Sequence, residues 1–407
     1  MNWGEIAQTR LSEIARCSLE SNGVTRFPFT PEHEAALEIM RVWMAEAGLD
    51  SHMDAAGTLV GRKEGPAGAP TFLIGSHQDS VRDGGRYDGI MGVVLGCLAL
   101  EKLAAEGVDL PFAVEVLAFA DEEGVRFPTA LLGPRALAGT FDKSVLAMTD
   151  GKGVTLRAAL TDFGCDPDGI SSLARDPENT LGYLEAHIEQ GPVLETVDSP
   201  LGIVTGICGI ERNTVVFTGD TGHAGTVPMS SRRDALVAAS DFIAAIHDAA
   251  GDVADLRATV GSLSLHPNVV NAIPSKVELT LEIRALQDSV RENFAKLARS
   301  QGKAISQTRH ADFSMTRTYE QPAVPCNVSL IELLETSANA ICRGAPRLPS
   351  GATHDASAMA DLCPISMLFV RCKDGVSHKP EEFATGDDMD AAIHAIAGFL
   401  RALSGAR

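Results

Sequence analysis

The sequence predicts an α/β protein in which a mostly parallel sheet domain is interrupted by a smaller α+β domain. Three observations support this fold class. With 407 residues, the chain is longer than one typical hydrophobic core needs, so two domains are expected. Strand-like and helix-like runs alternate at both ends, which is typical of a parallel sheet covered on both faces. Between 211 and 326 the order becomes strand-helix-strand-strand-helix-strand, the split arrangement of ferredoxin-like domains.

The N-terminal part of the chain supplies alternating elements. These are a helix at 32–47, a strand at 71–74, a helix at 90–105 and a strand at 112–119. Pro31 stands at the start of the first helix, where proline is tolerated, and Gly107 follows the second. The polar segment 149–179 fits neither pattern, and we expect it to be irregular.

The predicted insertion has its own elements. These are a strand at 213–218, a helix at 232–250, strands at 256–265 and 277–285, a helix at 290–302 and a strand-like segment at 304–316. The chain then returns to the first pattern. The elements there are a helix at 329–343, a strand at 365–371 and a helix at 387–403. We therefore predict a discontinuous catalytic domain at 1–210 and 327–407, and an inserted domain at 211–326.

The composition excludes several classes of protein. The net charge is -20, from 54 acidic and 34 basic residues, which argues against binding to nucleic acid or to anionic membranes. No apolar run is long enough to span a bilayer, and MNWGEIAQTRLSEIARCSLE has no signal-peptide core. The eight cysteines form no CxxC pair and are expected to be reduced and structural. We therefore expect a cytoplasmic protein.

Histidines and acidic residues gather in four segments that follow predicted strands. The segments are GSHQDSVRDGGRYDG, FADEEG, YLEAHIEQGP and GVSHKPEE. Ligands bind outside the carboxyl ends of strands in open α/β sheets, so these segments can converge. A histidine taken alone is more often a surface or core residue, and adjacent acids are most often solvated. Two carboxylates directly after a buried strand are poor structural choices, however, so the combined pattern favours a metal centre.

This donor set suits two divalent metal ions per subunit. His77 and His187 can each give an imidazole nitrogen to one ion. His378 and Glu123 can serve a second ion, and Asp88 can bridge the two with its two oxygens. Ions roughly 3.5–4 Å apart lower the pKa of a bound water toward neutrality. Zinc and manganese both suit mixed imidazole and carboxylate ligands, so the identity of the metal stays open.

Two acids and three glycines beside these ligands have separate predicted roles. Glu122 need not be a ligand, and its carboxylate can move a proton from water to a leaving nitrogen. Asp79 can accept the second ring N–H of the nearby histidine and so determine its tautomer. Gly84, Gly85 and Gly89 let the backbone fold tightly around the site.

The ordered motifs resemble one enzyme family. The motifs are GSHQDSVRDGGRYDG, FADEEGVRF, HIEQGPVLE, GHAGTVPMSSRRDA and SHKPEE. They are similar to those of the hydantoinase/carbamoylase family of dinuclear-metal amidohydrolases: N-carbamoyl-L-amino-acid hydrolases, allantoate amidohydrolases and yeast-type β-ureidopropionases. The resemblance spans nearly the whole chain and implies a zinc-peptidase-like domain with an inserted ferredoxin-like lid that also forms a homodimer. The implied metal ligands are His77, Asp88, Glu123, His187 and His378, with Glu122 as general base.

The substrates of the resembling family carry a carboxylate beside the ureido carbon, so a cationic partner is expected. Arg284 lies on the polar face of VELTLEIRA and can bind a carboxylate in bidentate fashion. From position alone, an exposed arginine paired with Glu282 is the more common case. The resemblance reverses this preference and implies that Arg284 binds the substrate.

Further substrate contacts are implied only by the resemblance. His223 matches a residue that helps to polarise the scissile carbonyl, although a loop histidine taken alone is more often in solvent. The other matches are Gln190 and Asn271 as polar contacts, and Gly351 and Ala352 as backbone N–H donors to the carboxylate. Lid residues can act within one subunit or across the dimer. Thr353 and Arg371 depart from the family pattern, which commonly has glycine and proline there, and they bear on the substrate rather than on hydrolysis.

The favoured function is metal-dependent hydrolysis of the ureido C–N bond of a small N-carbamoyl-L-amino acid, with release of amino acid, carbon dioxide and ammonia. Allantoate amidohydrolase is the close alternative, and a related amidase or peptidase on another N-acyl amino acid is a third. A binding or scaffolding protein without metals predicts replaced ligands, whereas all five ligand positions and Glu122 are present. The preferred side chain and the pathway stay open.

Overall fold

The computed structural model describes residues 2–405, and the chain divides into two compact units. The first unit comprises Met1–Thr205, Cys326–Leu348 and Thr353–Arg407, and the second comprises Gly206–Pro325 and Pro349–Ala352. Residue 1 and residues 406–407, at the ends of the predicted catalytic domain, lie outside the described part. Gly351 and Ala352 were expected in the discontinuous domain, but they group with the second unit.

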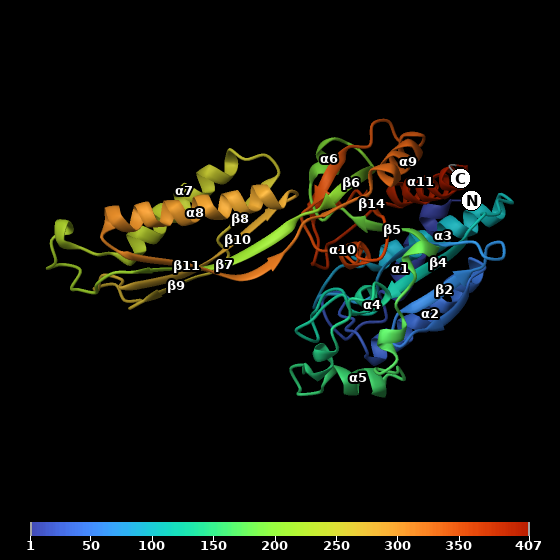
Figure 1. The fold of residues 1–407 in the computed structure, drawn as a ribbon, viewed down its shortest axis with the longest axis horizontal. Coiled ribbons are helices and arrows are strands. Elements are labelled where there is room, and N and C mark those ends of the chain that lie inside the picture. Colours follow the sequence, from blue (N-terminus) through green and yellow to red (C-terminus); the bar gives the residue numbers. More distant parts are fainter. Residues whose placement is uncertain (1, 406–407) are drawn as a thin grey trace. The chain divides into compact units, whose positions relative to one another are not determined.

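The large sheet and its helices form a mixed α/β fold (Figure 1). The strands are β1 (Asp50–Met53), β2 (Leu59–Lys63), β3 (Thr71–His77), β4 (Ala113–Phe119), β5 (Thr180–Ile188), β6 (Leu201–Ile207), β12 (Val324–Pro325), β13 (Arg347–Ser350) and β14 (Ile365–Val370). The helices are α1 (Trp3–Ile14), α2 (Pro31–Glu46), α3 (Ile90–Ala105), α4 (Leu132–Leu137), α5 (Leu156–Asp162), α6 (Val193–Thr196), α9 (Val328–Asn339), α10 (Ala356–Met359) and α11 (Gly386–Gly405). Short 3-10 turns are η1 (Lys143–Ala147), η2 (Ile170–Ser172), η3 (Pro177–Asn179) and η5 (Lys373–Gly375).

The order of strands brings distant parts of the sequence together. The sheet runs β1-β2-β4-β3-β5-β14-β6-β12, and β13 also pairs with β6. The central strands β4, β3, β5 and β14 are mutually parallel, whereas β1, β2, β6 and β12 pair antiparallel at the edges. The predicted parallel sheet is therefore confirmed for its centre. Because His77 pairs with Phe119 and His187 pairs with Phe369, the carboxyl ends of these strands lie at one edge.

Helix α3 begins in direct contact with the ends of β3 and β5. Its span matches the predicted 90–105, and it is buried on nearly every side, which explains its apolar sequence. A Cβ on Gly89, which has φ +66°, would lie 2.3 Å from the His77 ring. A Cβ on Gly92 would lie 2.3 Å from the carbonyl oxygen of Ala186. The two glycines thus allow the first turn of α3 and the residue before it to approach the histidine-bearing strands.

The expectation for 149–179 was only partly right. This polar segment contains α5 and two 3-10 turns. Thr155 caps α5, because its side chain accepts the N–H of Ala158, and such a cap satisfies a helix amide that has no partner within the helix. Leu156, Ala159 and Leu160 are buried, so three apolar residues support a helix that is too short to show a clear period.

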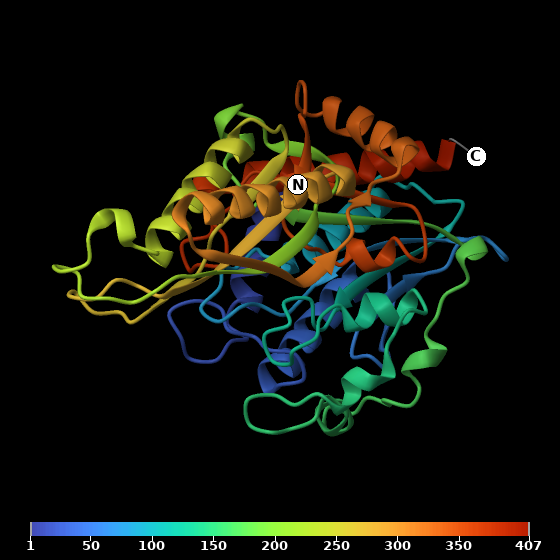
Figure 2. The same cartoon turned by 60° about the vertical axis from the view of Figure 1, so that its left-hand side comes forward.

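The second unit has its own antiparallel sheet. Its elements are β7 (Gly209–Thr218), η4 (Met229–Ser231), α7 (Ala235–Gly251), β8 (Leu256–Thr259), β9 (Leu263–His266), β10 (Lys276–Ala285), α8 (Asp288–Arg309) and β11 (Asp312–Gln321). The sheet order is β11-β7-β10-β8, and β9 also pairs with β10. Both helices lie over the same face of this sheet (Figures 1 and 2). Their packing forms a core that includes Phe217, Phe242 and Phe294.

Two predicted strands in this unit were wrong in part. The segment 304–316 is not mostly strand, because α8 continues to Arg309 and β11 starts at Asp312. Ile305, three residues after the buried Gly302, packs against the core of this unit, and this helical spacing continues the helix beyond 302. The predicted strand 256–265 is split into β8 and β9. Among the described residues, no helix is long and apolar enough to cross a membrane.

Candidate metal centre

The five predicted ligands converge at the carboxyl edge of the parallel strands. His77 ends β3, and His187 lies near the end of β5. Glu123 follows β4, His378 follows β14, and Asp88 lies two residues before the start of α3. Each ligand therefore comes from a different strand or connection, and the sheet order brings them together.

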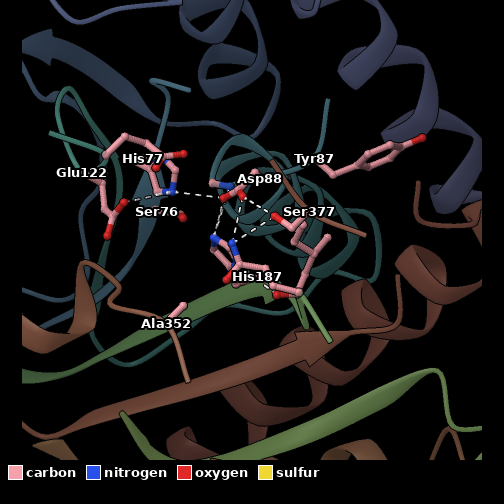
Figure 3. A network of polar contacts seen from close by, with 12 residues as sticks. Ser76, His77, Tyr87, Asp88, Glu122, His187, Ala352 and Ser377 are labelled. Carbon is pink, nitrogen blue, oxygen red and sulfur yellow. Dashed lines mark hydrogen bonds and ion pairs between the residues drawn. The ribbon is translucent and has the colours of Figure 1, made fainter. Parts of the chain in front are cut away.

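Asp88 lies at the centre of the cluster (Figure 3). Its Oδ1 is 3.1 Å from Nε2 of His187 and 3.5 Å from Nε2 of His77. Its Oδ2 is 3.3 Å from Nε2 of His378, which lies 3.8 Å from Oε1 of Glu123. One carboxylate thus faces two imidazoles with one oxygen and a third imidazole with the other.

Potential ligand atoms form overlapping groups of three, within which all atoms lie within 4.8 Å of one another. The groups are His77–Asp88–His187, Asp88–Glu123–His378 and His77–Glu122–Glu123. Asp88 belongs to the first two, which match the two donor sets expected from the sequence. A carboxylate that is shared in this way is suited to bridge two ions.

The imidazoles of the first group are oriented for metal binding. Nδ1 of His77 is 3.1 Å from the carbonyl oxygen of Asp79, and Nδ1 of His187 is 2.9 Å from that of Ile188. A carbonyl oxygen only accepts, so the proton of each neutral ring belongs on Nδ1 and the Nε2 lone pair faces Asp88. This is the tautomer that a metal ligand needs.

The buried charges also fit a cationic ligand. Burial raises the pKa of Glu122 well above its usual value and that of Glu123 to about 7. Burial acts in the same direction on Asp88, but the nearby histidines, His187 first, reverse this and hold its pKa well below the usual range. Oε1 of Glu123 has no hydrogen-bond partner among the described residues. Divalent cations would supply the positive charge that such buried carboxylates require.

Asp79 connects two of the segments that carry predicted ligands. Its carboxylate accepts the N–H groups of Glu122 at 3.1 Å and Glu123 at 3.2 Å. Its Oδ1 is 3.4 Å from Nδ1 of His77, farther than its own carbonyl oxygen. The Asp79 carboxylate therefore lies near the His77 ring, but the closer contact to the ring is made by the Asp79 carbonyl oxygen.

Two further side chains contact the shared carboxylate. Gln190, expected on the substrate, donates from Nε2 to Oδ2 of Asp88 at 2.9 Å. Ser377 donates from Oγ to the same oxygen at 2.8 Å. The sequence reasoning did not assign a role to Ser377, and the available signal was its place directly before His378. The Oε1 atom of Gln190 has no hydrogen-bond partner within 2–405.

Arg284 and Gly351 lie together in the second unit. Nε of Arg284 donates to Oε1 of Glu282 at 2.7 Å, and Nη1 donates to the carbonyl oxygen of Gly351. The Ala352 N–H donates to Oγ of Ser350 at 3.1 Å. The ion pair with Glu282 is the contact that position alone favoured.

His223 and Asn271 lie together at the other end of the same sheet. His223 forms a β-bridge with Ala272, and the Ala224 N–H donates to the carbonyl oxygen of Asn271 at 2.9 Å. Nδ1 of His223 accepts the N–H of Gly225 at 3.1 Å, so in the neutral ring Nε2 carries the proton and can donate. The five predicted substrate residues that this unit contains thus form two separate groups.

Arg371, one of the two departures from the family pattern, has a structural partner. It forms two bonds to Asp388, in the first turn of α11, at 2.8 and 3.1 Å. A third bond joins it to Asp198 at 2.8 Å. Asp388 is buried, so this arginine compensates its charge and attaches α11 to the end of β14. Thr353, the other departure, follows the segment that groups with the second unit.

Histidines and carboxylates gathered at the carboxyl edge of an α/β sheet, in groups that can hold metal ions, define a metal-dependent hydrolase. Comparison with known proteins shows the family to which this hydrolase belongs. The chain belongs to the peptidase family M20/M25/M40, which matches residues 48–402.

Similar proteins narrow the class of reaction. The chain is 40% identical to an N-carbamoyl-L-amino acid amidohydrolase of Geobacillus stearothermophilus, over 95% of each chain. It is 37% identical to an allantoate deiminase of Arabidopsis thaliana, over 97% of this chain and 81% of the relative. A solved hydantoinase/carbamoylase family amidase from Burkholderia multivorans has a TM-score of 0.91 at 30% identity, over 98% of this chain and 97% of the other. The predicted resemblance is confirmed, and the protein is a hydrolase that acts on amide C–N bonds.

Proposed function

We propose that the protein hydrolyses the ureido C–N bond of N-carbamoyl-L-amino acids. The net reaction consumes water and releases the amino acid, carbon dioxide and ammonia. The observation that carries the proposal is the shared carboxylate of Asp88 between two donor groups, with Glu122 beside them. Similarity to relatives named for this activity supports the choice of substrate.

The proposed centre holds two divalent ions. His77 and His187 would bind one, Glu123 and His378 the other, and Asp88 both. When bound, the ions lower the pKa of a water molecule and polarise the ureido carbonyl. Zinc and manganese both remain candidates, because imidazole and carboxylate ligands suit either.

Glu122 is the proposed proton carrier. Its Oε2 lies 3.9 Å from Nε2 of His77, at the side of the first donor group. Burial, which raises its pKa, strengthens its affinity for a proton. The carboxylate would take a proton from the attacking water and deliver it to the leaving nitrogen. His223, with Nε2–H available as a donor, would stabilise the charge that develops on the carbonyl oxygen.

Arg284 is the proposed partner of the substrate carboxylate. Replacement by alanine removes a charge-assisted hydrogen bond, so we expect KM to rise about 10- to 100-fold with a smaller change in kcat. Steady-state kinetics on an N-carbamoyl-L-amino acid measure this split. Arg212→Ala is the matched control, because Arg212 also pairs with Glu282 and is more exposed. An unchanged KM in Arg284→Ala would exclude the proposed contact.

The distance between Arg284 and His223 in the second unit supports a homodimer in which each active site takes residues from both subunits. Arg284 pairs with Ile210 and Lys276 pairs with Thr218, so β10 covers roughly 25 Å between the two positions. The bridge between His223 and Ala272 lies beyond the Lys276 end. One small ureido acid is too short to contact both groups of one chain. We therefore propose that each site of a dimer takes Arg284 from one chain and His223 with Asn271 from the other.

Mixing two inactive variants tests this sharing. Glu122→Gln chains would keep a functional His223, and His223→Ala chains would keep a functional Glu122. If His223 acts across the dimer, we expect mixing to restore about a quarter of wild-type activity. Half of the dimers would be mixed, and each of these would have one complete site. Activity that stays at the level of the separate variants, after subunit exchange is verified by size and mass, would assign His223 to its own chain.

A substrate panel tests the function itself. We expect ammonia release to be fastest with N-carbamoyl-L-amino acids, when carbamoyl-β-alanine and allantoate are compared in parallel with manganese and with zinc. Allantoate as the best substrate would favour the allantoate amidohydrolase alternative. Two bound ions without ammonia release from any ureido compound would favour an amidase or peptidase on another N-acyl amino acid.

A further inference from the structure

Glu382 is a buried carboxylate that lies outside the proposed ligand set. It is 3% exposed and follows His378 by four residues. Its Oε1 accepts the N–H of Tyr87 at 2.9 Å and the N–H of Asp88 at 3.0 Å. The carboxylate therefore holds the backbone of the residue whose side chain both donor groups share. Figure 3 shows Tyr87 and Asp88 beside each other in this network.

The same carboxylate also lies next to a side chain that contacts Asp88. Its Oε2 is 3.3 Å from Oγ of Ser377. Ser377 has one hydroxyl proton, and its shorter contact, 2.8 Å to Oδ2 of Asp88, assigns that proton to Asp88. Glu382 thus holds the backbone of Asp88. Ser377, which packs against Glu382, holds the side chain of Asp88.

The backbone of Glu382 stabilises the loop of a second ligand. Its N–H donates to the carbonyl oxygen of Lys379 at 3.1 Å, which closes the turn directly after His378. His378 has φ +59°, a conformation that a residue other than glycine adopts only when its surroundings hold it there. Glu382 therefore connects Asp88, which belongs to both donor groups, to the loop of His378, which belongs to only one of them.

The segment around Gly85 leaves room for the Glu382 carboxylate. A Cβ on Gly85 would lie 2.1 Å from Oε1 of Glu382, so a larger residue would displace the carboxylate. On the other side, the Phe383 ring packs edge-on against Tyr87, with ring centroids 5.9 Å apart. Gly85 and Tyr87 on one loop thus interlock with Glu382 and Phe383 on the other.

We propose that Glu382 is a positioning residue that sets the Asp88 carboxylate and the His378 imidazole relative to each other. This inference rests on the proposed metal centre. Hydrogen-bond partners of metal ligands typically change metal affinity or activity by about 10- to 100-fold when they are removed. If the carboxylate only stabilised the fold, its removal would lower the free energy of unfolding and leave the metal affinity unchanged.

Glu382→Ala in the full-length protein is the test. We expect affinity for manganese alone and for zinc alone, measured by competition with a chelating dye, to fall about 10- to 100-fold. At saturating metal, kcat falls while KM changes little, because the substrate contacts are untouched. Glu382→Gln keeps an oxygen that can accept the two backbone N–H groups, so it recovers most of the affinity. Glu381→Ala is the matched control, because Glu381 is the exposed neighbour.

The outcomes separate this inference from the proposed function. Wild-type metal affinity and kcat in Glu382→Ala would overturn the inference and leave the metal centre in place. A lower melting temperature of the chelated protein with unchanged metal affinity would also overturn it. A wild-type protein that binds neither metal would remove the centre itself. If Glu382→Ala does not fold, Gly85→Ala displaces the carboxylate instead, and the same measurements and criteria apply.

Discussion

Replacement of Glu122 by glutamine should leave both metal ions bound and lower kcat by about 10²- to 10⁴-fold, the usual contribution of a general acid–base group. The amide has nearly the shape of the carboxylate, but it cannot carry a proton from water to the leaving nitrogen. Elemental analysis of the purified variant measures the metals, and ammonia release at saturating substrate measures kcat. Glu381→Gln, at an exposed carboxylate, controls for the change in charge.

Two results would contradict the proposed role of Glu122. A rate near that of the wild type would show that another group moves the proton. Loss of one ion would place Glu122 among the ligands, and its geometry makes this a real alternative. Glu122 shares a group of possible ligand atoms with His77 and Glu123.

Among these changes, replacement of Asp88 should lower the number of bound metal ions most. Because its two oxygens face both donor groups, Asp88→Ala is expected to lower the metal content from about two ions per chain to near zero and to abolish turnover. His378→Ala removes a ligand of the second group only, so about one ion should remain. Inductively coupled plasma analysis after dialysis against trace metal measures both contents.

Controls separate loss of metal from loss of fold. Asp88→Asn keeps the shape and one acceptor oxygen for Gln190 and Ser377, so it should fold even if the alanine variant does not. Its circular dichroism should match that of chelated wild-type protein. His52→Ala, at an exposed histidine, should keep both ions. Equal metal loss in Asp88 and His378 variants would mean that the two groups do not bind independently, and full retention in Asp88→Asn would remove Asp88 as the bridge.

Several features of the site were predictable because they are local. The helix at 90–105 was predicted at both ends, since its apolar run is flanked by glycines at 89 and 107. The candidate ligands could be selected from short motifs, because each motif follows a strand and the carboxyl ends of parallel strands share an edge. Helix α8 was cut short because periodicity alone cannot distinguish a helix end from a strand start near residue 304.

Other features depended on contacts between distant residues. Ser377 and Asp88 are 289 positions apart, yet they share a hydrogen bond. Arg371 stood out as a departure from the family pattern, but its role became clear only from Asp388 and Asp198. The position of Gly85 beside Glu382 likewise has no signature in either motif alone.

By itself, the sequence determined the chemistry available to this protein: the residue types at the site, their order, and the strands and helices that carry them. Local spacing and side-chain type encode these properties, and no knowledge of the sheet order is needed. Only the tertiary structure decided that Asp88 stands between three imidazoles, that Glu382 joins two ligand loops, and that Arg284 and His223 lie at opposite ends of one sheet. These relations arise because strands pair out of chain order, β3 with β5 and β5 with β14, and strand pairing depends on packing across the whole unit.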